Sequence, residues 1–371
     1  MKLLIACGGT SGHINPAIAV ANEFKKNIPD MDILFIGTKE NLEADLVPRA
    51  GYNMKYIKVT GLKRSKSFSS LIYNSKALFK FLNSEMKVRN IIKTFKPDIV
   101  LGTGGYVSAP VMYAAVRMHI KTVIHEQNAF AGVTTQMLAP RVDKVLLSFP
   151  LSNTLKGASS KSVLVGNPAK QEFYTMKKEE ARLKLGIKAD EPLILSYGGS
   201  LGAKKINQAF CEMAKISASE NFITHYHGAA RDYEYVKQTL GDVFNSPRIK
   251  VFEYIYNMPE VMAAADLVIS RSGAMTLTEL AALGKASILI PSPNVTENHQ
   301  YYNAKAYEDA GAAILLPEDN LNGISLYNLI RELIWDKHRL NSMGNCAKAL
   351  SHRNATSNIC EEIMKLVVSS D

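Results

Sequence analysis

The sequence predicts an α/β protein built from two doubly wound, Rossmann-like domains that face each other across a cleft. Its 371 residues are enough for two domains of roughly 150 residues. Short, continuously apolar runs alternate with helical patterns, which is typical of parallel sheets covered on both faces. The opening of the chain also recurs in its second half. Ligands of such sheets bind at the carboxyl ends of the strands, so we expect the site there.

The recurrence is the strongest organisational signal. Each half opens with an apolar run, a turn of the form Gly-Gly-hydroxyl-x-Gly, and a helical pattern. The first turn holds Gly8, Gly9, Thr10 and Gly12, and the second holds Gly198, Gly199, Ser200 and Gly202. Backbone amides and a helix dipole at such a turn can hold an anion, although a turn without a ligand is the alternative for either one alone.

The remaining elements follow in order. Gly166 and Pro168 interrupt the pattern, which places the domain boundary between 1–168 and 169–351. The expected strands of the first half are 2–6, 33–36, 99–101, 122–124 and 145–147. Those of the second half are 193–197, 222–224, 250–252, 267–269 and 287–290.

Composition excludes several classes of protein. With 47% hydrophobic and 21% charged residues, the chain is neither disordered nor a disulfide-stapled scaffold. Its four cysteines form no CxxC pair, so we expect reduced thiols in a protein that stays inside the cell. The uncharged stretch 99–116 contains Gly102, Gly104, Gly105 and Pro110, which favours a strand, a glycine loop and a helix over a membrane span.

The net charge of +10 is local. Residues 63–96 hold nine basic residues and one acidic residue, Glu85, so the rest of the chain is nearly balanced. A nucleic-acid binder would spread basic and aromatic residues along a groove, and we therefore expect no nucleic-acid partner.

Polar residues cluster where strands are expected to end. Residues 125–128, His-Glu-Gln-Asn, follow 122–124 and suit a sugar, with a solvated loop as the alternative. Arg271, Ser272 and Gly273 follow 267–269 and open a helix that contains Glu279. Such a helix start is a further place for a phosphate.

The first glycine turn is followed by His13, at the position where a base in the cleft would lie. Neither glycine turn has Walker or GxGxxG spacing, which argues against nucleotide hydrolysis. Glu40 follows the second strand, so a dinucleotide site stays an alternative. Asp30 and Asp32 are spaced like a metal-binding DxD, but they precede a strand, and we expect them to be solvated.

Taken together, these motifs resemble the bacterial peptidoglycan N-acetylglucosaminyltransferases that make the lipid-linked disaccharide-pentapeptide. The matching segments occur in the family's order over nearly the whole chain. They are 8–13, 102–110, 125–128, 166–168, 198–200, 271–274 and 298–300.

The resemblance implies a GT-B glycosyltransferase that inverts the anomeric carbon and uses no metal or cofactor. The implied donor is UDP-N-acetylglucosamine. The implied acceptor is undecaprenyl-pyrophosphoryl-N-acetylmuramoyl-pentapeptide, met by a peripheral enzyme at the cytoplasmic face of the cell membrane. The first domain, joined by a C-terminal helix at about 352–371, would bind acceptor and membrane, and the second would bind the UDP-sugar.

Site residues also carry over. His13 would be the catalytic base, with Glu126 in reserve, and acceptor contacts would come from Gly104, Tyr106 and His125. Lys170 and Leu201 depart from the family's arginine and glutamine. The implied donor-binding residues are Thr10, Ser11, Gly12, Asn128, Lys170, Ser200, Ile255, Ala274, Met275, Thr276, Leu277, Thr278, Glu279 and Gln300.

The basic segment then has a use at the membrane, because exposed apolar residues beside lysines bind anionic lipid. An ordinary amphipathic helix with a solvated basic face is the alternative. The expected membrane residues are Lys63, Arg64, Lys66, Leu71, Lys76, Phe79 and Lys80.

Two other functions stay open at this point. A GT-B enzyme for a soluble natural product or another glycolipid would share the fold. A non-catalytic nucleotide-sugar-binding protein would keep the glycine turns without needing His13.

Overall fold

The computed structural model describes residues 1–59, 68–151, 155–199, 202–218 and 223–368. The chain folds into two compact units. Unit 1 comprises Met1–Pro168 together with Asn354–Asp371, and unit 2 comprises Ala169–Arg353. The chain therefore passes from one unit to the other after Pro168 and returns after Arg353.

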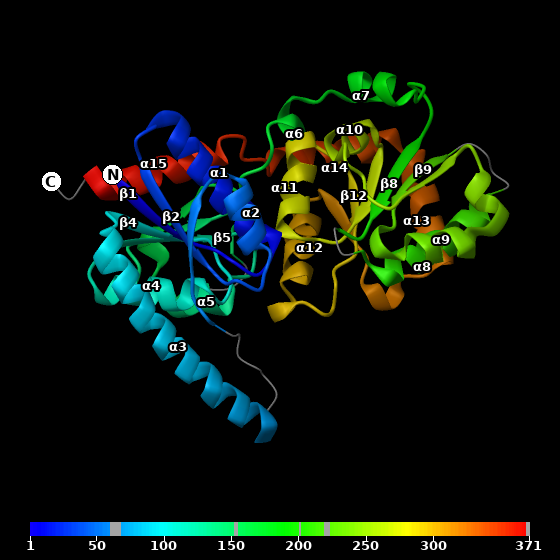
Figure 1. The fold of residues 1–371 in the computed structure, drawn as a ribbon. Coiled ribbons are helices and arrows are strands. Elements are labelled where there is room, and N and C mark those ends of the chain that lie inside the picture. The colour runs from blue at the N-terminus through cyan, green and yellow to red at the C-terminus, as the bar shows by residue number, and fades with distance from the viewer. Residues whose placement is uncertain (60–67, 152–154, 200–201, 219–222, 369–371) are drawn as a thin grey trace. The chain divides into compact units, whose positions relative to one another are not determined.

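Unit 1 contains a seven-stranded sheet with the order β3-β2-β1-β4-β5-β6-β7 (Figure 1). Every adjacent pair in it is parallel. Its strands are β1 (Lys2–Ala6), β2 (Asp32–Gly37), β3 (Asn53–Tyr56), β4 (Ile99–Gly102), β5 (Lys121–Glu126), β6 (Lys144–Leu147) and β7 (Ser162–Leu164).

Helices cover both faces of this sheet (Figure 1). Leu3 and Ile5 of β1 belong to one apolar core, whereas Leu4 and Ala6 belong to a second core on the other face. Packing on both faces explains why these strands are continuously apolar. The helices are α1 (Ser11–Asn27) and α15 (Ala355–Val368) on one face, and α3 (Phe68–Phe95), α4 (Ser108–Arg117) and α5 (Val133–Leu138) on the other, with α2 (Glu43–Arg49) following β2.

The C-terminal helix is part of the unit 1 core. Ile359 and Ile363 of α15 are fully buried against β1 and α1 residues such as Ile5 and Val20. An ion pair of 2.5 Å between Lys144 and Glu362 joins the same helix to β6. The last helix therefore completes the first unit of the chain.

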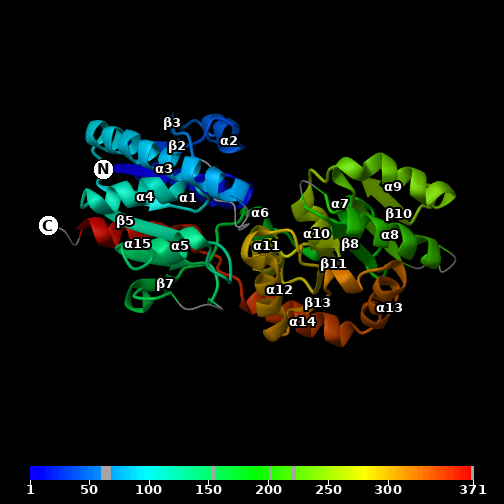
Figure 2. The same cartoon turned by 90° about the horizontal axis from the view of Figure 1, so that it is seen from below.

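Unit 2 contains a six-stranded parallel sheet with the order β10-β9-β8-β11-β12-β13. Helices α8 and α13 lie on one side of it and α11 on the other (Figure 2). The strands are β8 (Leu193–Tyr197), β9 (Thr224–Gly228), β10 (Ile249–Phe252), β11 (Leu267–Ser270), β12 (Ser287–Leu289) and β13 (Ala313–Leu315). The α-helices are α6 (Glu172–Thr175), α7 (Lys178–Leu185), α8 (Lys204–Ser217), α9 (Tyr233–Leu240), α10 (Met258–Ala264), α11 (Ala274–Leu283), α12 (His299–Asp309), α13 (Gly323–Ile334) and α14 (Lys337–Ala349).

The prediction of two parallel, doubly wound sheets is confirmed. In both units the first strand of the half lies in the middle, with β1 between β2 and β4 and β8 between β9 and β11. The two turns are not identical, however. Gly12 already lies in α1, whereas Gly202 has a φ of +77° and α8 begins at Lys204. A left-handed residue cannot continue a right-handed helix, so the second helix starts later.

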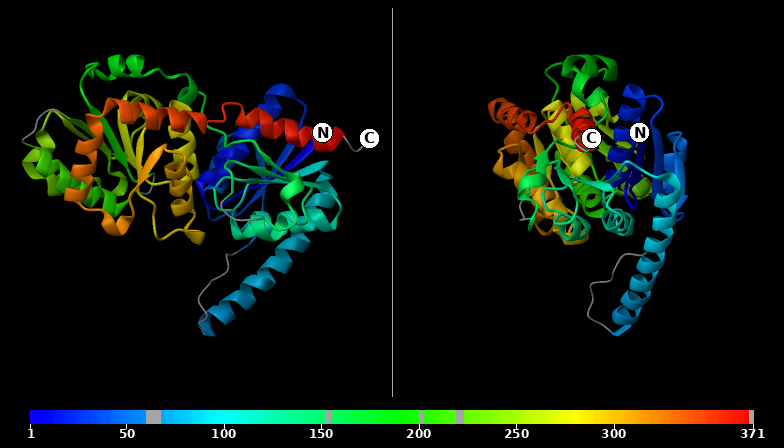
Figure 3. Two further views of the ribbon diagram at one scale, coloured as in Figure 1. Left: turned by 180° about the vertical axis from the view of Figure 1, so that it is seen from behind. Right: turned by 90° about the vertical axis from the view of Figure 1, so that its left-hand side faces the viewer.

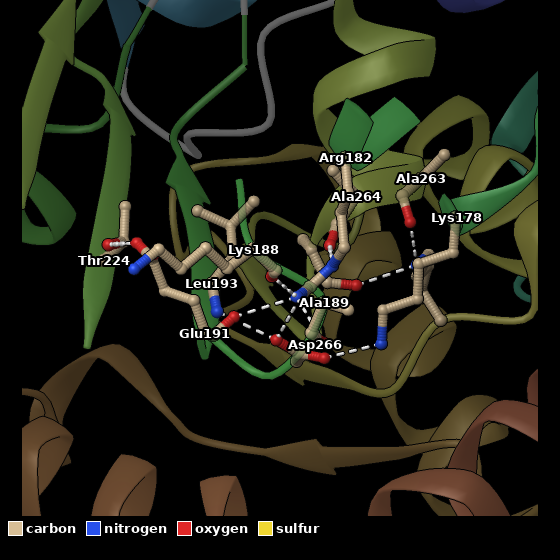
Figure 4. Close-up of polar contacts among 12 residues, drawn as sticks. Lys178, Arg182, Lys188, Ala189, Glu191, Leu193, Thr224, Ala263, Ala264 and Asp266 are labelled. Carbon is tan, nitrogen blue, oxygen red and sulfur yellow. Dashed lines mark hydrogen bonds and ion pairs between the residues drawn. The ribbon is translucent and has the colours of Figure 1, made fainter. Parts of the chain in front are cut away.

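A polar cluster fixes the amino ends of the unit 2 strands (Figure 4). The buried Arg182 guanidinium donates to the carbonyls of Ala264 and Lys188 at 3.0 and 2.8 Å and forms an ion pair of 2.6 Å with Asp266. Asp266 also pairs with Lys178 at 2.6 Å and accepts from the Leu193 amide at 2.8 Å. Because ligands of parallel sheets bind at the opposite edge, this cluster has a structural role.

The uncharged stretch 99–116 forms β4, a glycine loop and most of α4, as expected. The cysteines Cys7, Cys211, Cys346 and Cys360 are free thiols. Within the described parts of the chain, no helix combines the length and the apolar character needed to cross a bilayer.

Candidate functional site

The carboxyl ends of β1, β4 and β5 form one edge of the unit 1 sheet, because these strands are neighbours in it. The segments after them, 7–13, 103–106 and 127–128, therefore lie together. They carry most of the residues that the sequence predicted for catalysis and acceptor binding. This edge is the first half of the candidate site.

The glycine loop after β4 lies directly on the turn after β1. A Cβ on Gly105 would come within 2.2 Å of the Gly8 carbonyl oxygen, and one on Gly104 would come within 2.6 Å of His13 Nδ1. Both residues also have positive φ angles, +107° for Gly104 and +77° for Gly105. Glycine is thus required at both positions, by backbone conformation and by close approach.

His13 lies in the first turn of α1 and is half-buried. Its Nδ1 is 2.8 Å from Oε1 of Gln127, and its carbonyl oxygen accepts a hydrogen bond of 2.8 Å from the Thr103 hydroxyl. The ring is thus fixed at one nitrogen by the residue that follows β5, and its backbone is fixed by the residue that follows β4. The geometry leaves Nε2 as the nitrogen that can act on a ligand.

His125 and Glu126 lie in strand β5 itself, whereas the sequence prediction placed them after the strand. Pairing with β4 ends at Ile124, but β6 continues beside β5, with His125 opposite Leu146 and Glu126 opposite Leu147, so the strand runs to Glu126. His125 is 1% exposed, and burial lowers its pKa to about 4. Both ring nitrogens have partners, Gln127 on Nδ1 and the Gly166 carbonyl on Nε2, each at 3.0 Å. This burial weighs against direct contact between His125 and an acceptor.

Glu126 is fully engaged in holding the segment that follows β5. One of its oxygens accepts from the backbone and side-chain nitrogens of Asn128 at 3.1 and 3.2 Å. The other accepts from the Gly132 amide at 3.0 Å and the Thr135 hydroxyl at 2.6 Å. With four donors around it, this carboxylate is a poor general base, and its contacts orient Asn128 instead.

Sequence reasoning missed a buried carboxylate at the first glycine turn. Glu43 of α2 accepts from the Gly9 amide at 3.0 Å and from the amide and hydroxyl of Thr38 at 3.0 and 2.7 Å. The sequence analysis singled out Glu40 as the acidic residue after the second strand. In the structure Glu40 is exposed, and the buried acidic residue after that strand is Glu43. These bonds occupy the oxygens that a dinucleotide's ribose would need.

Tyr106, expected at the acceptor, lies at the same edge. Its hydroxyl accepts a hydrogen bond of 2.6 Å from Asn41, which also donates to Thr38 at 2.7 Å. Thr10 is exposed, and Ser11 and Gly12 are half-buried beside it. Asp30 and Asp32 are exposed around the amino end of β2, away from this edge.

In unit 2 the corresponding edge is formed by the carboxyl ends of β8, β11 and β12. After β11 the chain enters α11 through Gly273, and the first turn of this helix contains no acidic residue. The Ser272 hydroxyl donates to the Gln300 carbonyl at 2.7 Å, and Gln300 Oε1 accepts from the Ser292 amide at 2.9 Å. A helix N-terminus held in this way can accept an anion.

The predicted donor residues of α11 divide between two faces. Ala274, Leu277 and Thr278 are buried, and the Thr278 hydroxyl donates to the Ala274 carbonyl at 2.8 Å. Their side chains belong to the interior of unit 2. Met275, Thr276 and Glu279 are half-buried and lie on the opposite side of the helix.

Glu279 has an unusual charge environment. Burial raises its pKa to about 7, and the positive charge of Lys170 acts in the opposite direction. A carboxyl group in this range can accept hydrogen bonds from hydroxyls when ionised and donate one when protonated.

A hollow of about 680 Å³ opens beyond the carboxyl ends of β9 and β10, between residues such as Arg231, Phe252 and Tyr254. Ile255, expected at the uracil, is 6% exposed and lies in the chain between Tyr254 and Tyr256, which both line this hollow. Ser200 and Leu201 lie outside the described residues.

Comparison with known proteins agrees with this architecture. The chain matches the glycosyltransferase family 28 N-terminal domain over residues 3–147 and the family 28 C-terminal domain over residues 193–359. A crystal structure of Acinetobacter baumannii MurG superposes with a TM-score of 0.79 at 28% identity, covering 98% of this chain and 99% of that one. The S. aureus MnaA-UDP co-structure, at 15% identity and a TM-score of 0.68, shares the fold, covering 99% of this chain and 97% of that one.

Two curated relatives carry the name UDP-N-acetylglucosamine–N-acetylmuramyl-(pentapeptide) pyrophosphoryl-undecaprenol N-acetylglucosamine transferase. The protein from Acetivibrio thermocellus is 46% identical over 99% of this chain and 98% of its own length. The one from Clostridioides difficile is 40% identical over 100% of this chain and 90% of its own length. The chain therefore belongs to glycosyltransferase family 28 and, within it, to the family of these N-acetylglucosamine transferases.

Proposed function

We propose that this enzyme transfers N-acetylglucosamine from UDP-N-acetylglucosamine to the 4-hydroxyl of undecaprenyl-pyrophosphoryl-N-acetylmuramoyl-pentapeptide. The product is the β-1,4-linked lipid-disaccharide precursor of peptidoglycan. The observation that carries the proposal is the end-to-end likeness to transferases of that name. The glycine turns, the His13 environment and the α11 N-terminus support it with a matching set of chemical groups.

In this proposal unit 1 supplies the proton chemistry. His13 Nε2 takes the proton of the acceptor hydroxyl while the hydroxyl oxygen attacks the anomeric carbon from the face opposite UDP. The bond from that carbon to the diphosphate breaks, so the configuration inverts and UDP leaves. Glu126 supports Asn128 rather than acting as a second base, because its oxygens already accept four hydrogen bonds.

Unit 2 holds the donor. The amides at the start of α11 face the diphosphate and stabilise the negative charge that grows on it as UDP leaves. Met275, Thr276 and Glu279 are on the accessible side of that helix, so Glu279 is assigned to the ribose hydroxyls. Ile255 is assigned to the uracil, and Lys170, Ser200 and Gln300 complete the proposed donor contacts.

We further propose that α3 holds the enzyme at the anionic cytoplasmic face of the cell membrane. Its amino-terminal part projects beyond the unit 1 sheet (Figures 1 and 3). Leu82 and Met86 are 49% and 59% exposed and lie one turn apart on the solvent-facing side of α3. Lys80 and Lys87 are also exposed and flank these two apolar residues. Apolar and basic side chains together suit an anionic lipid interface.

The membrane segment expected from the sequence begins before residue 80. Lys63, Arg64 and Lys66 lie outside the described residues, and Leu71, Lys76 and Phe79 lie in the amino-terminal part of α3. The proposal therefore depends on residues 80–87. Co-sedimentation with anionic vesicles is expected to fall when Lys80 and Lys87 are both changed to glutamate. Binding that ignores both vesicle charge and these substitutions would contradict it.

The reaction itself is tested by measuring UDP release and lipid-linked product with and without the muramoyl acceptor. We expect product and rapid UDP release only when the lipid-linked acceptor is present. Transfer to a soluble acceptor alone would favour a natural-product glycosyltransferase. UDP-sugar binding without any transfer would favour a non-catalytic binding protein.

A further inference from the structure

We propose that Gln127 is a positioning residue that holds the proton of His13 on Nδ1 and so presents Nε2 as a lone pair to the acceptor hydroxyl. His125 and the Gly166 carbonyl anchor this chain of hydrogen bonds from inside unit 1. The kinetic part of the inference rests on the proposed function of His13 as the base. The arrangement of protons follows from the hydrogen-bond contacts together with the burial of His125.

The chain begins at a group that can only accept. The Gly166 carbonyl oxygen lies 3.0 Å from His125 Nε2, and because a carbonyl oxygen only accepts, a hydrogen on Nε2 satisfies this contact. The Ser148 hydroxyl, 3.0 Å from the same nitrogen, donates to the Gly166 carbonyl at 3.3 Å and can accept from that hydrogen. His125 is buried, and its pKa of about 4 keeps the ring neutral at pH 7. A neutral imidazole has one N–H, so His125 Nδ1 presents a lone pair.

The amide of Gln127 is oriented by His125. Its Nε2 lies 3.0 Å from His125 Nδ1 and 2.9 Å from the His125 carbonyl oxygen. Both of these groups are acceptors, and the two hydrogens of the amide nitrogen satisfy them. The reversed amide would place an oxygen against two acceptors, so the hydrogen-bond chemistry selects one orientation.

Gln127 Oε1 consequently faces His13, at 2.8 Å from Nδ1. An amide oxygen only accepts, so Nδ1 of His13 must be the protonated nitrogen. The ring is held in place against the Gly104 backbone, where a Cβ would come within 2.6 Å of Nδ1. A neutral His13 then has its lone pair on Nε2, which is the form that a general base requires.

The same contact serves the charged form of the base. When Nε2 takes the acceptor proton, His13 becomes an imidazolium with a hydrogen on each nitrogen. Its Nδ1–H still donates to Gln127 Oε1, and this bond strengthens because the donor is now charged. A neutral amide thus fixes the His13 tautomer in both the reactant and the transition state. Unlike a carboxylate partner, it adds no negative charge near the departing diphosphate.

The proton positions can be read directly by nitrogen NMR of the full chain labelled with ¹⁵N-histidine, at a pH where His13 is neutral. His13→Asn identifies the His13 signals. In the unchanged protein we expect an Nδ1 with an attached hydrogen and an Nε2 without one. Gln127→Glu, which keeps an acceptor oxygen, retains that pattern, whereas Gln127→Leu loses it and gives a mixture of tautomers.

Kinetics then tests what the tautomer is for. We expect Gln127→Leu to lower kcat about 10-fold or more, which is a smaller loss than removal of the general base itself would cause. The KM for UDP-N-acetylglucosamine should change little. The matched control is Gln238→Leu, on the exposed face of α9 in unit 2, which leaves kcat and the His13 signals unchanged.

Each outcome decides a separate claim. A His13 protonated on Nε2 in the unchanged protein, or an Nδ1–H that survives Gln127→Leu, overturns the positioning role. A changed tautomer with an unchanged kcat overturns its catalytic importance. Near-normal turnover of His13→Ala overturns the proposed base, and the NMR pattern of the unchanged protein distinguishes that failure from failure of the hydrogen-bond chain.

Discussion

The glycine turns after β1 and β8 share their residue spacing but differ in their surroundings. In unit 1 the Gly9 amide donates to the buried Glu43 carboxylate, and Gly105 lies against the Gly8 carbonyl. In unit 2 Gly198 lies close to Ala203, since a Cβ on Gly198 would come within 2.3 Å of the Ala203 amide nitrogen. Gly9 and Gly199 have similar φ angles, +92° and +86°. The second glycine of each turn thus has a similar φ angle in different chemical surroundings.

The difference assigns a task to each unit. A carboxylate that already occupies the Gly9 amide would repel a diphosphate, whereas His13 beside it suits proton transfer. Unit 2 instead offers the start of α11, with no acidic residue in its first turn. A repeated turn therefore indicates a repeated fold. Which ligand group binds at each turn depends on the side chains that surround it.

The largest expected effect comes from filling the space between the unit 1 turns. Gly105→Ala would place a methyl group 2.2 Å from the Gly8 carbonyl at a φ of +77°. We expect the free energy of unfolding to fall by about 3 kcal/mol or more, measured by urea denaturation. Gly199→Ala is the matched control, because Gly199 has a positive φ but no atom of the described residues lies within 4 Å of the new Cβ. Equal losses in the two variants would remove the distinction between the turns.

Glu43→Gln tests whether the buried carboxylate organises the first turn. It loses charge-assisted bonds to the amides of Gly9 and Thr38, so we expect a loss of about 2 kcal/mol in the free energy of unfolding. Calorimetric UDP affinity should stay unchanged, because the diphosphate is assigned to unit 2. Glu40→Gln, at an exposed position, is the control. Tighter UDP binding in Glu43→Gln would instead place the diphosphate at the unit 1 turn.

Glu279→Gln has a smaller effect and probes the donor side. Losing hydrogen bonds from ribose hydroxyls to a charged group should weaken UDP binding roughly 10-fold at pH 8. UDP affinity of the unchanged enzyme should also fall as pH drops below about 7, the pKa of Glu279. A pH-independent affinity that Glu279→Gln leaves intact would contradict the ribose assignment.

The same residue gives a stability signature of defined sign. Because its folded-state pKa lies above the ordinary value of 4.5, the folded protein binds more protons than the unfolded chain between pH 4.5 and about 7. Stability from this group therefore decreases as pH rises through that window. In urea denaturation at pH 8, Glu279→Gln should be more stable than the unchanged protein by about 1 kcal/mol or more. Identical pH dependence in the two proteins would contradict the raised pKa.

Much of the fold follows from local sequence pattern. The apolar runs and glycine turns predict both parallel sheets, since burial on both faces leaves a continuous hydrophobic signature. Strand β9 is less visible because it contains His225 and His227, and the predicted bounds of 222–224 were wrong: the strand is Thr224–Gly228. His227 is buried through bonds of 2.7 Å to the Ser196 hydroxyl and 3.0 Å to Asn207 Oδ1, and its ring stacks on Phe210. Such compensation depends on residues far away in sequence.

The same limit applies to the site. His13 and its neighbouring glycines are visible as a motif, and so is the His-Glu-Gln-Asn segment. The separate roles of these residues cannot be predicted from the motifs, because the roles depend on how far β5 extends and on which side chains β5 buries. Gln127 and Glu43 act through contacts with residues 114 and 34 positions away. Only the folded chain shows that Gln127 contacts the His13 ring and that Glu43 accepts from the Gly9 amide.

The most direct test of the account is the single-turnover rate of sugar transfer by His13→Ala, with saturating UDP-N-acetylglucosamine and the lipid-linked acceptor. We expect the rate to fall by about 100-fold or more, the usual scale for loss of a general base, while UDP affinity stays at its normal value. A near-normal rate, or a lost rate that is explained by lost UDP binding, would contradict the assignment of proton chemistry to unit 1 and of donor binding to unit 2.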